Sequence, residues 1–304
     1  MIEDHLDALP KLLLTGASGT LAPFLRDALD RHWDVVPFGN RSLPENGGRA
    51  DFGIREEAFK ALDECRPNAI LHAAALTDVD RCEREPDAAF HANVASNRHI
   101  SEWCLRQSAP IRLLTISTDQ VYSGLGPFDE AQVRPSNVYG LTKLSGEALA
   151  GLVPNSLIVR VNFFAAGPTV KAGLTHWLIN ALLAETPITL FDDVLFNPLY
   201  AGDFGDLVAD LLRSPATGVV NAGARSPVSK AEFAIQIANA FGLSLKNAKA
   251  GSVDDGNLSA KRPKDMRMNL DRIETILARS MPTVSDGIER LANDSKTIRW
   301  VPGR

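Results

Sequence analysis

Short apolar runs alternate with helical patterns over the first half of the chain. Apolar residues after the run Leu12–Leu14 recur at helical spacing, at Leu21, Phe24, Leu25, Ala28 and Leu29. Further apolar runs predict strands at residues 34–38, 69–72, 112–117 and 156–161, and the patterns between them predict helices at 55–65, 86–107 and 136–151. Buried strands that alternate with helices are typical of a parallel sheet covered on both faces. The sequence therefore predicts an α/β fold with a doubly wound parallel sheet over residues 1–165.

The pattern is less regular in the second half of the chain. It predicts helices at residues 174–184, 201–213 and 230–241, and strands at 188–191 and 218–221. We interpret residues 166–304 as a smaller α/β substrate-binding lobe, with elements around residues 195–225 that return to the first domain. Residues 249–265, rich in Gly, Ser, Asp and Lys, are predicted to be the least regular part.

Composition narrows the class of partner. The 304 residues are 45% hydrophobic and 23% charged, with a net charge of −5, so we expect neither nucleic acid nor an anionic membrane as a partner. The first ten residues are acidic and lack the pattern of a secretory signal, and no apolar stretch approaches about 18 residues. Three widely spaced cysteines, Cys65, Cys82 and Cys104, predict reduced thiols in a cytoplasmic protein.

A glycine-containing loop between the first strand and the first helix is a candidate cofactor site. A dinucleotide pyrophosphate can lie there against backbone N–H groups and the positive end of the helix. Gly16 allows the tight turn and Gly19 a close approach of the backbone. A plain strand-to-helix turn is the alternative interpretation. The residues assigned to cofactor binding in this loop are Gly16, Ser18, Gly19, Thr20 and Leu21.

The end of the second predicted strand favours NADP(H) over NAD(H). NAD sites usually carry an acidic residue there for the ribose 2′-hydroxyl, whereas this chain has Asn40 and Arg41. Arg41 is suited to a 2′-phosphate, and an exposed loop arginine is the alternative. Asp51 and Phe52, shortly before the next helix, are candidates for contacting the adenine, with a surface turn as the alternative.

Three small residues, Ala73, Ala74 and Ala75, follow the strand at residues 69–72 and leave room for a cofactor across its carboxyl end. Packing alone is the alternative reason for small residues at this place. His72 is interpreted as a core histidine with satisfied hydrogen bonds. Asn93, inside an apolar helical pattern, is predicted to hold a neighbouring strand or loop by hydrogen bonds and so to support the cofactor site.

Thr118, Tyr139 and Lys143 carry the candidate chemistry. Thr118 ends a predicted strand, so its hydroxyl should emerge at the carboxyl edge of the sheet, where it can donate to a carbonyl oxygen. Tyr139 and Lys143 are four residues apart, which is about 6 Å along a helix and places both on one face. A nearby ammonium lowers the pKa of a phenol and makes it a usable acid.

At these residues the chain resembles the extended short-chain dehydrogenase/reductase superfamily, most closely its dTDP-4-dehydrorhamnose reductase-like members. The shared motifs are His72 to Asp80, Ser117 to Tyr122, Pro135 to Lys143, and Lys261-Arg262-Pro263. The resemblance implies a Rossmann domain and a nicotinamide cofactor, with Thr118, Tyr139 and Lys143 as catalytic triad. Tyr139 would deliver a proton to a sugar-ring ketone, and Lys143 would bind the nicotinamide ribose. It further implies substrate contacts at Thr77, Val121, Asn162, Phe163 and Arg262.

Departures from the family pattern refine the expected activity. Gln120 stands where sugar-nucleotide 4,6-dehydratases carry a second carboxylate, which disfavours dehydration, whereas a sugar-nucleotide epimerase stays open. Phe163 replaces a tryptophan of the reductase sugar site, so the identity of the substrate is open. Phe24 stands at an acidic position that some reductases use for a metal-linked dimer, so no magnesium is expected.

The first functional hypothesis is an NADPH-dependent reductase of a keto group on a nucleotide-activated deoxysugar. The second is a non-catalytic cofactor-binding regulatory subunit, similar to the beta subunit of methionine adenosyltransferase. A reductase of a non-nucleotide keto substrate is the third. Helices on the outer faces of such sheets often pair into a homodimer, but this is an analogy of fold and the sequence leaves the oligomeric state open.

Overall fold

The computed structural model describes residues 9–40, 44, 46–168, 170 and 173–297. Its centre is a seven-stranded sheet with the strand order β11-β6-β5-β4-β1-β2-β3, and every neighbouring pair is parallel. The strands are β1 (Lys11–Thr15), β2 (Asp34–Gly39), β3 (Gly48–Arg49), β4 (Ala69–His72), β5 (Arg112–Thr118), β6 (Ser156–Val161) and β11 (Gly218–Ala222). The predicted doubly wound parallel α/β sheet is confirmed.

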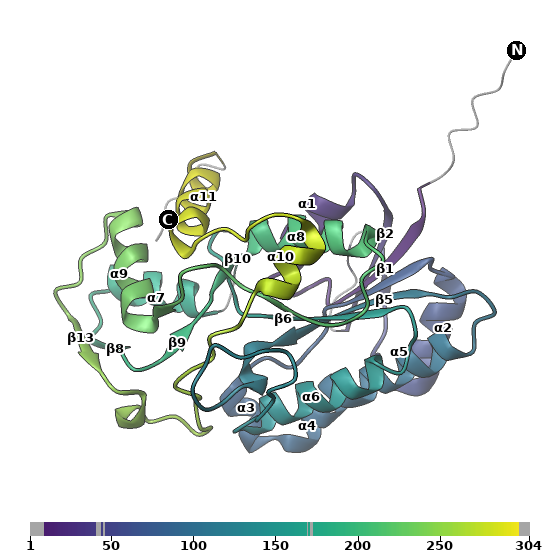
Figure 1. The fold of residues 1–304 in the computed structure, drawn as a ribbon, viewed down its shortest axis with the longest axis horizontal. Coiled ribbons are helices and arrows are strands. Elements are labelled where there is room, and N and C mark those ends of the chain that lie inside the picture. Colours follow the sequence, from purple (N-terminus) through teal and green to yellow (C-terminus); the bar gives the residue numbers. More distant parts are fainter. Residues whose placement is uncertain (1–8, 41–43, 45, 169, 171–172, 298–304) are drawn as a thin grey trace, which may run out of the picture.

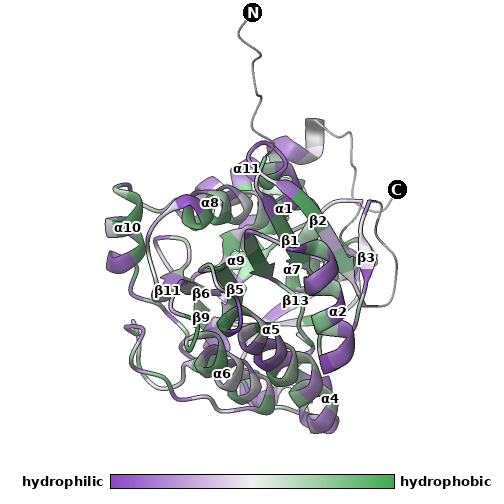
Figure 2. Ribbon diagram, turned by 90° about the vertical axis from the view of Figure 1, so that its right-hand side faces the viewer, coloured by the Kyte–Doolittle hydropathy of each residue, from purple (hydrophilic) through white to green (hydrophobic). Residues whose placement is uncertain are grey.

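Helices cover both faces of this sheet (Figure 1). On one face α1 packs against α8, and on the other α5 packs against α2 and α6. The helices are α1 (Ala22–Leu29), α2 (Arg55–Cys65), α5 (Ser96–Leu105), α6 (Val138–Ala150) and α8 (Ala201–Arg213). Successive side chains of β1 point to opposite faces of the sheet. Leu12 and Leu14 therefore pack in one buried cluster, and Leu13 packs in a second one. Figure 2 shows these hydrophobic strands between the helix layers.

The second lobe lies beside the carboxyl edge of the sheet (Figure 1). Its strands form three two-stranded pairs, and α7 packs against α9. Its helices and strands are α7 (Leu174–Leu183), α9 (Lys230–Phe241), β7 (Phe163–Phe164), β8 (Ile188–Phe191), β9 (Leu195–Phe196), β10 (Leu199–Tyr200), β12 (Val228–Ser229) and β13 (Ala248–Gly251). The chain then returns along the sheet with α10 (Asp271–Leu277), which contacts β11, and ends in α11 (Val284–Thr297), which contacts α9.

The helix predicted at residues 86–107 is interrupted. The structure has α4 (Pro86–Phe90), a π-helical turn at His91–Ala95, and then α5. Before them comes the short α3 (Val79–Arg84), and η2 (Asp119–Val121) is a 3₁₀ turn after β5. The π-turn contains Asn93, whose backbone carbonyl accepts a hydrogen bond from the Asn97 side chain. Such turns occur where a helix is adjusted to present a side chain, and here that side chain is Asn93.

Three further findings bear on function classes. Cys65, Cys82 and Cys104 are buried free thiols. Within the described ranges, no helix is long and apolar enough to cross a bilayer. No cluster of three or more His, Cys, Asp or Glu side chains in the part of the chain that the structure describes could hold a metal ion.

Candidate active site

The glycine loop after β1 lies between the ends of β2 and β4. Gly16 has a φ of +74°, and a Cβ on it would lie 2.8 Å from the backbone nitrogen of Ala74, so only glycine fits this approach. Ala17 N donates to Phe38 O over 3.1 Å, and Gly19 N donates to Gly16 O over 2.9 Å. The loop is thereby fixed to both neighbouring strands at the point where a pyrophosphate would bind.

The remaining loop residues differ in exposure. Ser18 and Gly19 are exposed and Thr20 is half-buried, whereas the Leu21 side chain is in the core. The predicted contact of Leu21 with a cofactor is therefore limited to its backbone. Leu21 is also the N-cap residue of α1, so its backbone N–H lies at the positive end of the helix.

A buried hydrogen-bond network joins β1 to β4 through Thr15 and His72. Thr15 Oγ1 accepts from the backbone nitrogens of Ala73 and Ala74, both over 3.1 Å, and its own proton therefore points to His72 Nδ1 at 2.8 Å. His72 Nε2 donates to Ser96 Oγ over 3.1 Å, because the Ser96 proton is used on Ala92 O. Burial lowers the pKa of His72 to about 3, so the ring is neutral. His72 thus has the satisfied core role expected from the sequence.

Asp51 follows β3, and hydrogen bonds hold its side chain in place. It accepts from Gly53 N over 2.9 Å and lies 3.1 Å from His91 Nε2. Burial opposes ionisation, but these hydrogen bonds outweigh it and hold the pKa of Asp51 below its usual value. The Phe52 ring is only 5% exposed and packs edge-on against Phe38, so its side chain belongs to the core and the predicted contact of Phe52 with adenine would use its backbone.

Asn40 lies at the end of β2, where its backbone oxygen accepts from Arg49 Nε over 3.1 Å. The sequence reasoning did not find Arg49, because β3, on which it lies, has only two residues and no hydrophobic pattern. Arg41, assigned to a 2′-phosphate, lies outside the described residues.

Asn93 joins three parts of the site. Its Oδ1 accepts from Leu76 N over 2.9 Å, and its Nδ2 donates to Leu76 O over 3.2 Å and to Thr142 Oγ1 over 3.1 Å. Thr142 lies on α6 next to Lys143, and Leu76 follows the small segment Ala73 to Ala75, whose residues are half-buried. The expected structural role of Asn93 agrees with these contacts.

The structure brings Thr118, Tyr139 and Lys143 together. Thr118 is the last residue of β5, and the other two lie on α6, all three buried. The Thr118 hydroxyl lies close enough to the Tyr139 phenol to act on its pKa. Lys143 Nζ donates to the carbonyl of Ile116 over 2.7 Å. The phenol, the threonine hydroxyl and the ammonium therefore share one end of the sheet, where ligands of such folds bind.

The charges of this group follow from its burial. Burial lowers the pKa of Lys143 to about 8, against the opposing effect of the Glu147 carboxylate. Burial raises the pKa of Tyr139, and the nearby Thr118 hydroxyl only partly opposes this. The expected net lowering of the Tyr139 pKa by Lys143 is therefore not found in the structure, because desolvation of the phenol outweighs the other effects.

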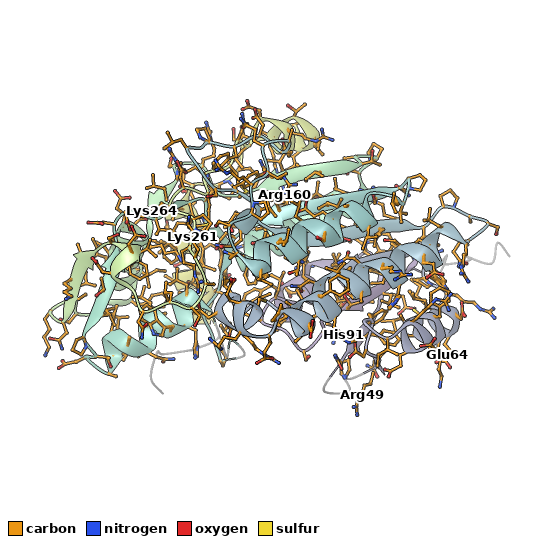
Figure 3. The ribbon with its side chains drawn as sticks, turned by 90° about the horizontal axis from the view of Figure 1, so that it is seen from below. Arg49, Glu64, His91, Arg160, Lys261 and Lys264 are labelled. Atoms are coloured by element: carbon orange, nitrogen blue, oxygen red, sulfur yellow. The ribbon has the colours of Figure 1, made fainter. Side chains whose placement is uncertain are left out.

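A second buried network holds α6 against the sheet. Glu147 accepts from Arg160 Nη2 over 2.6 Å and from Ser117 Oγ over 2.5 Å. Arg160 also donates to the Tyr122 hydroxyl over 2.7 Å, and that hydroxyl donates to Asn221 Oδ1 over 2.7 Å. Figure 3 places Arg160 in the interior, beside the sheet. The helix that carries Tyr139 and Lys143 is thereby tied to β5, β6 and β11.

The start of α6 is held just as closely to η2, the turn that follows Thr118. Asn137 caps the helix by accepting from Gly140 N over 2.8 Å, so α6 begins two residues after the predicted start at residue 136. Its Nδ2 donates to Gln120 Oε1 over 3.1 Å and to the backbone oxygen of Lys261 over 2.9 Å. A Cβ at Gly140 would lie 2.3 Å from the Gln120 carbonyl oxygen. Helix, loop and second lobe therefore meet at Asn137.

The residues predicted to contact the substrate differ in their burial and in their hydrogen bonds. Asn162 Nδ2 donates to Asp119 Oδ2 over 2.7 Å, and Phe163 is half-buried in β7. Thr77 is exposed, whereas the Val121 side chain is fully buried in a cluster with Tyr122, which leaves only its backbone for the predicted substrate contact. Burial raises the pKa of Asp119 to about 6, with hydrogen bonds from Asn162 and Thr118 opposing it.

Arg262 is held in an ion pair between the lobes. Its Nη2 donates to Asp80 Oδ2 over 2.7 Å and its Nη1 to Ala260 O over 2.9 Å, while Asp80 Oδ1 accepts from Ala260 N over 2.8 Å. Asp80 lies on α3 of the first lobe. The sequence reasoning found neither this pair nor Lys230, at the start of α9, whose charge interacts with those of Asp119 and Arg262.

Comparison with known proteins assigns the family. Residues 10–297 match the family model of the RmlD substrate binding domain. The dTDP-4-dehydrorhamnose reductase of Streptomyces griseus is 33% identical over 221 residues, 70% of this chain and 69% of that protein. Methionine adenosyltransferase 2 subunit beta of Rattus norvegicus is 25% identical over 88% of this chain and 82% of that protein.

A solved structure agrees with the fold. The dTDP-4-dehydrorhamnose reductase of Bacillus anthracis, determined in complex with NADP, superposes with a TM-score of 0.84 over 94% of this chain and 99% of that one. Its 24% sequence identity supports likeness of fold alone. The family match, in contrast, spans both lobes and all the residues described above. The chain belongs to the RmlD substrate binding domain family.

Proposed function

We propose that this protein is an oxidoreductase of the short-chain dehydrogenase/reductase type that uses NADPH to reduce a keto group on a nucleotide-linked deoxysugar. The observation that carries the proposal is the group formed by Thr118, Tyr139 and Lys143 at the carboxyl edge of the sheet. The family membership and the reductase named among the relatives support it.

Each catalytic group has a definite task in this reaction. A bound dihydronicotinamide supplies the hydride for the carbonyl carbon. Thr118 donates a hydrogen bond to the carbonyl oxygen, and Tyr139 transfers its proton to that oxygen as negative charge develops there. The ammonium of Lys143 then stabilises the phenolate, which needs such a charge because burial raises the pKa of Tyr139. The products are an alcohol and the oxidised cofactor.

The residues present fit a nicotinamide dinucleotide. The loop from Gly16 to Thr20 would hold the pyrophosphate, Ala73 to Ala75 would leave room beside it, and Tyr139 and Lys143 would flank the nicotinamide ribose. The preference for NADPH is supported by the absence of a carboxylate at Asn40 and by Arg49, whose guanidinium is hydrogen-bonded there. Arg41 would add a second positive charge.

Two alternatives are less well supported. An epimerase would use the same tyrosine but retain its cofactor through the cycle. A regulatory subunit, suggested by the likeness to methionine adenosyltransferase 2 subunit beta, would not need Thr118 beside the Tyr139 phenol. The intact buried triad favours catalysis.

The direct test is to mix the protein with NADPH and dTDP-4-dehydro-6-deoxy sugars and to follow the loss of NADPH absorbance. We expect one equivalent of NADPH to be consumed for each alcohol formed, with slower turnover on NADH. Conversion between two sugar epimers without consumption of NADPH would favour the epimerase. No turnover on any nucleotide-linked keto sugar would refute the proposal.

A further inference from the structure

Lys230 starts α9 from a rigidly held backbone. Ser229 caps the helix by accepting from Glu232 N over 3.0 Å, and Glu232 in turn accepts from Ser229 N over 2.7 Å. Lys230 N donates to Val194 O over 2.9 Å. These bonds fix the point from which the Lys230 side chain leaves the second lobe.

The Lys230 ammonium lies on the side of the second lobe that faces Asp119, the first residue of η2. Its Nζ is 5.8 Å from the centre of the Phe196 ring, and the charges that act on it most are those of Asp119 and Arg262. Asp119 follows the catalytic Thr118 directly. Lys230 is therefore near the residue that follows Thr118, although it lies on an element far from Thr118 in the sequence.

This ammonium differs from the neighbouring cations because it has no hydrogen-bond or ion-pair partner among the described residues. Arg262 is paired with Asp80, and Lys264 with Asp193 and Asp254. Asp119 accepts from Thr118 and Asn162 but forms neither a hydrogen bond nor an ion pair with the Lys230 ammonium. Lys230 thus keeps three N–H donors for another partner.

Surrounding protein makes an unpaired charge costly. Lys230 is partly buried, and burial lowers its pKa, with the Asp119 charge opposing this. An anionic oxygen group would offset that cost by accepting charge-assisted hydrogen bonds, and the nearby Arg262 adds a second positive charge.

We propose that Lys230 is a substrate-recognition residue that binds an anionic oxygen group of the substrate between the two lobes. The inference rests on the proposed function in that the ligand is a nucleotide-linked sugar. Such a ligand offers two sources of this chemistry, the diphosphate and a carboxylate on the sugar.

Binding is the suitable test because it does not depend on turnover. We would titrate the cofactor-loaded protein with dTDP, UDP-glucose and UDP-glucuronic acid by calorimetry. The last two differ by one sugar carboxylate, and dTDP has the diphosphate without a sugar. The variants are Lys230→Gln, Lys230→Arg as the charge-conserving form, and Lys264→Gln as a control for general loss of positive charge.

We expect Lys230→Gln to weaken binding by about 10- to 100-fold, Lys230→Arg to restore most of it, and Lys264→Gln to match the wild type. Loss for all three ligands assigns Lys230 to the diphosphate, and loss for UDP-glucuronic acid alone assigns it to the carboxylate. The inference is overturned by equal affinities of Lys230→Gln and wild type, by an equal loss in Lys264→Gln, or by a wild type that binds none of the ligands. A wild type that binds these ligands but reduces no keto sugar would refute only the proposed function.

Discussion

The two walls of the site are built in different ways. On the first lobe, Thr118, Tyr139 and Lys143 are buried, and hydrogen bonds fix Thr118 to Gln120 N and Lys143 to the Ile116 carbonyl. On the second lobe, the Lys230 ammonium has no hydrogen-bond or ion-pair partner among the described residues. Under our two proposals, the first wall carries out the reaction and the second binds the substrate. Variants in the two walls should therefore change turnover and substrate binding separately.

The largest expected effect comes from removing the proposed proton donor of the first wall. Tyr139→Phe deletes one hydroxyl and keeps the ring packing, so turnover should fall by about 10²- to 10⁴-fold while cofactor affinity stays unchanged. Steady-state NADPH oxidation and a cofactor titration measure the two quantities. Retained turnover would show that the first wall does not hold the acid.

The support of the first wall should be the next most sensitive part. Glu147→Gln leaves the buried Arg160 guanidinium without its carboxylate, so we expect the free energy of unfolding to fall by about 3–5 kcal/mol in urea titrations. The matched exposed pair is Arg279 with Asp210, and Arg279→Gln should cost at most about 1 kcal/mol. Similar losses in both variants would mean that burial of the pair is unimportant.

The sequence could predict the first wall because its residues lie in local motifs. The spacing of Tyr139 and Lys143 requires only a helix, and the place of Thr118 requires only a strand end, so both follow from short-range pattern. The predicted α9, at residues 230–241, also has the bounds that the structure shows. Its capping residues Ser229 and Glu232 give a local reason for that agreement.

The second wall depends on tertiary contacts, which no local pattern encodes. Lys230 looks like any helix-starting lysine until the fold places it near Asp119, which is 111 positions earlier in the numbering. The burial of the Phe52 and Val121 side chains was missed for the same reason, since only tertiary packing decides whether an apolar side chain enters a core. The pairing of Arg262 with Asp80 likewise joins distant segments.

Asp119 lies between the walls, and its titration provides a pH-dependent test. The pKa of its carboxyl is raised from the usual 3.8 to about 6 by burial, so the folded state binds this proton more tightly than the unfolded state. Its contribution to stability is therefore present below about pH 4 and is lost as the pH rises to about 6. The full loss is on the order of 3 kcal/mol.

Asp119→Asn removes this titration. Relative to the wild type, the variant should gain on the order of 2–3 kcal/mol in the free energy of unfolding between about pH 4 and pH 7. Urea titrations at several pH values measure the difference. Parallel pH profiles for the two proteins would show that the Asp119 carboxyl is not desolvated between the walls.

The smallest expected effect concerns the cofactor edge of the first wall. Thr15→Val keeps the side-chain shape but removes the oxygen that accepts from Ala73 N and Ala74 N and donates to His72. The turn that packs on Gly16 would lose its anchor, so NADPH affinity should fall by about tenfold, with turnover at saturating cofactor nearly unchanged. The matched control is Thr175→Val on α7, because that buried hydroxyl has no hydrogen-bond partner in the described part of the chain. If both variants bind NADPH as the wild type does, the Thr15–His72 network supports the fold without positioning the cofactor, and preorganisation of the first wall is confined to the catalytic residues.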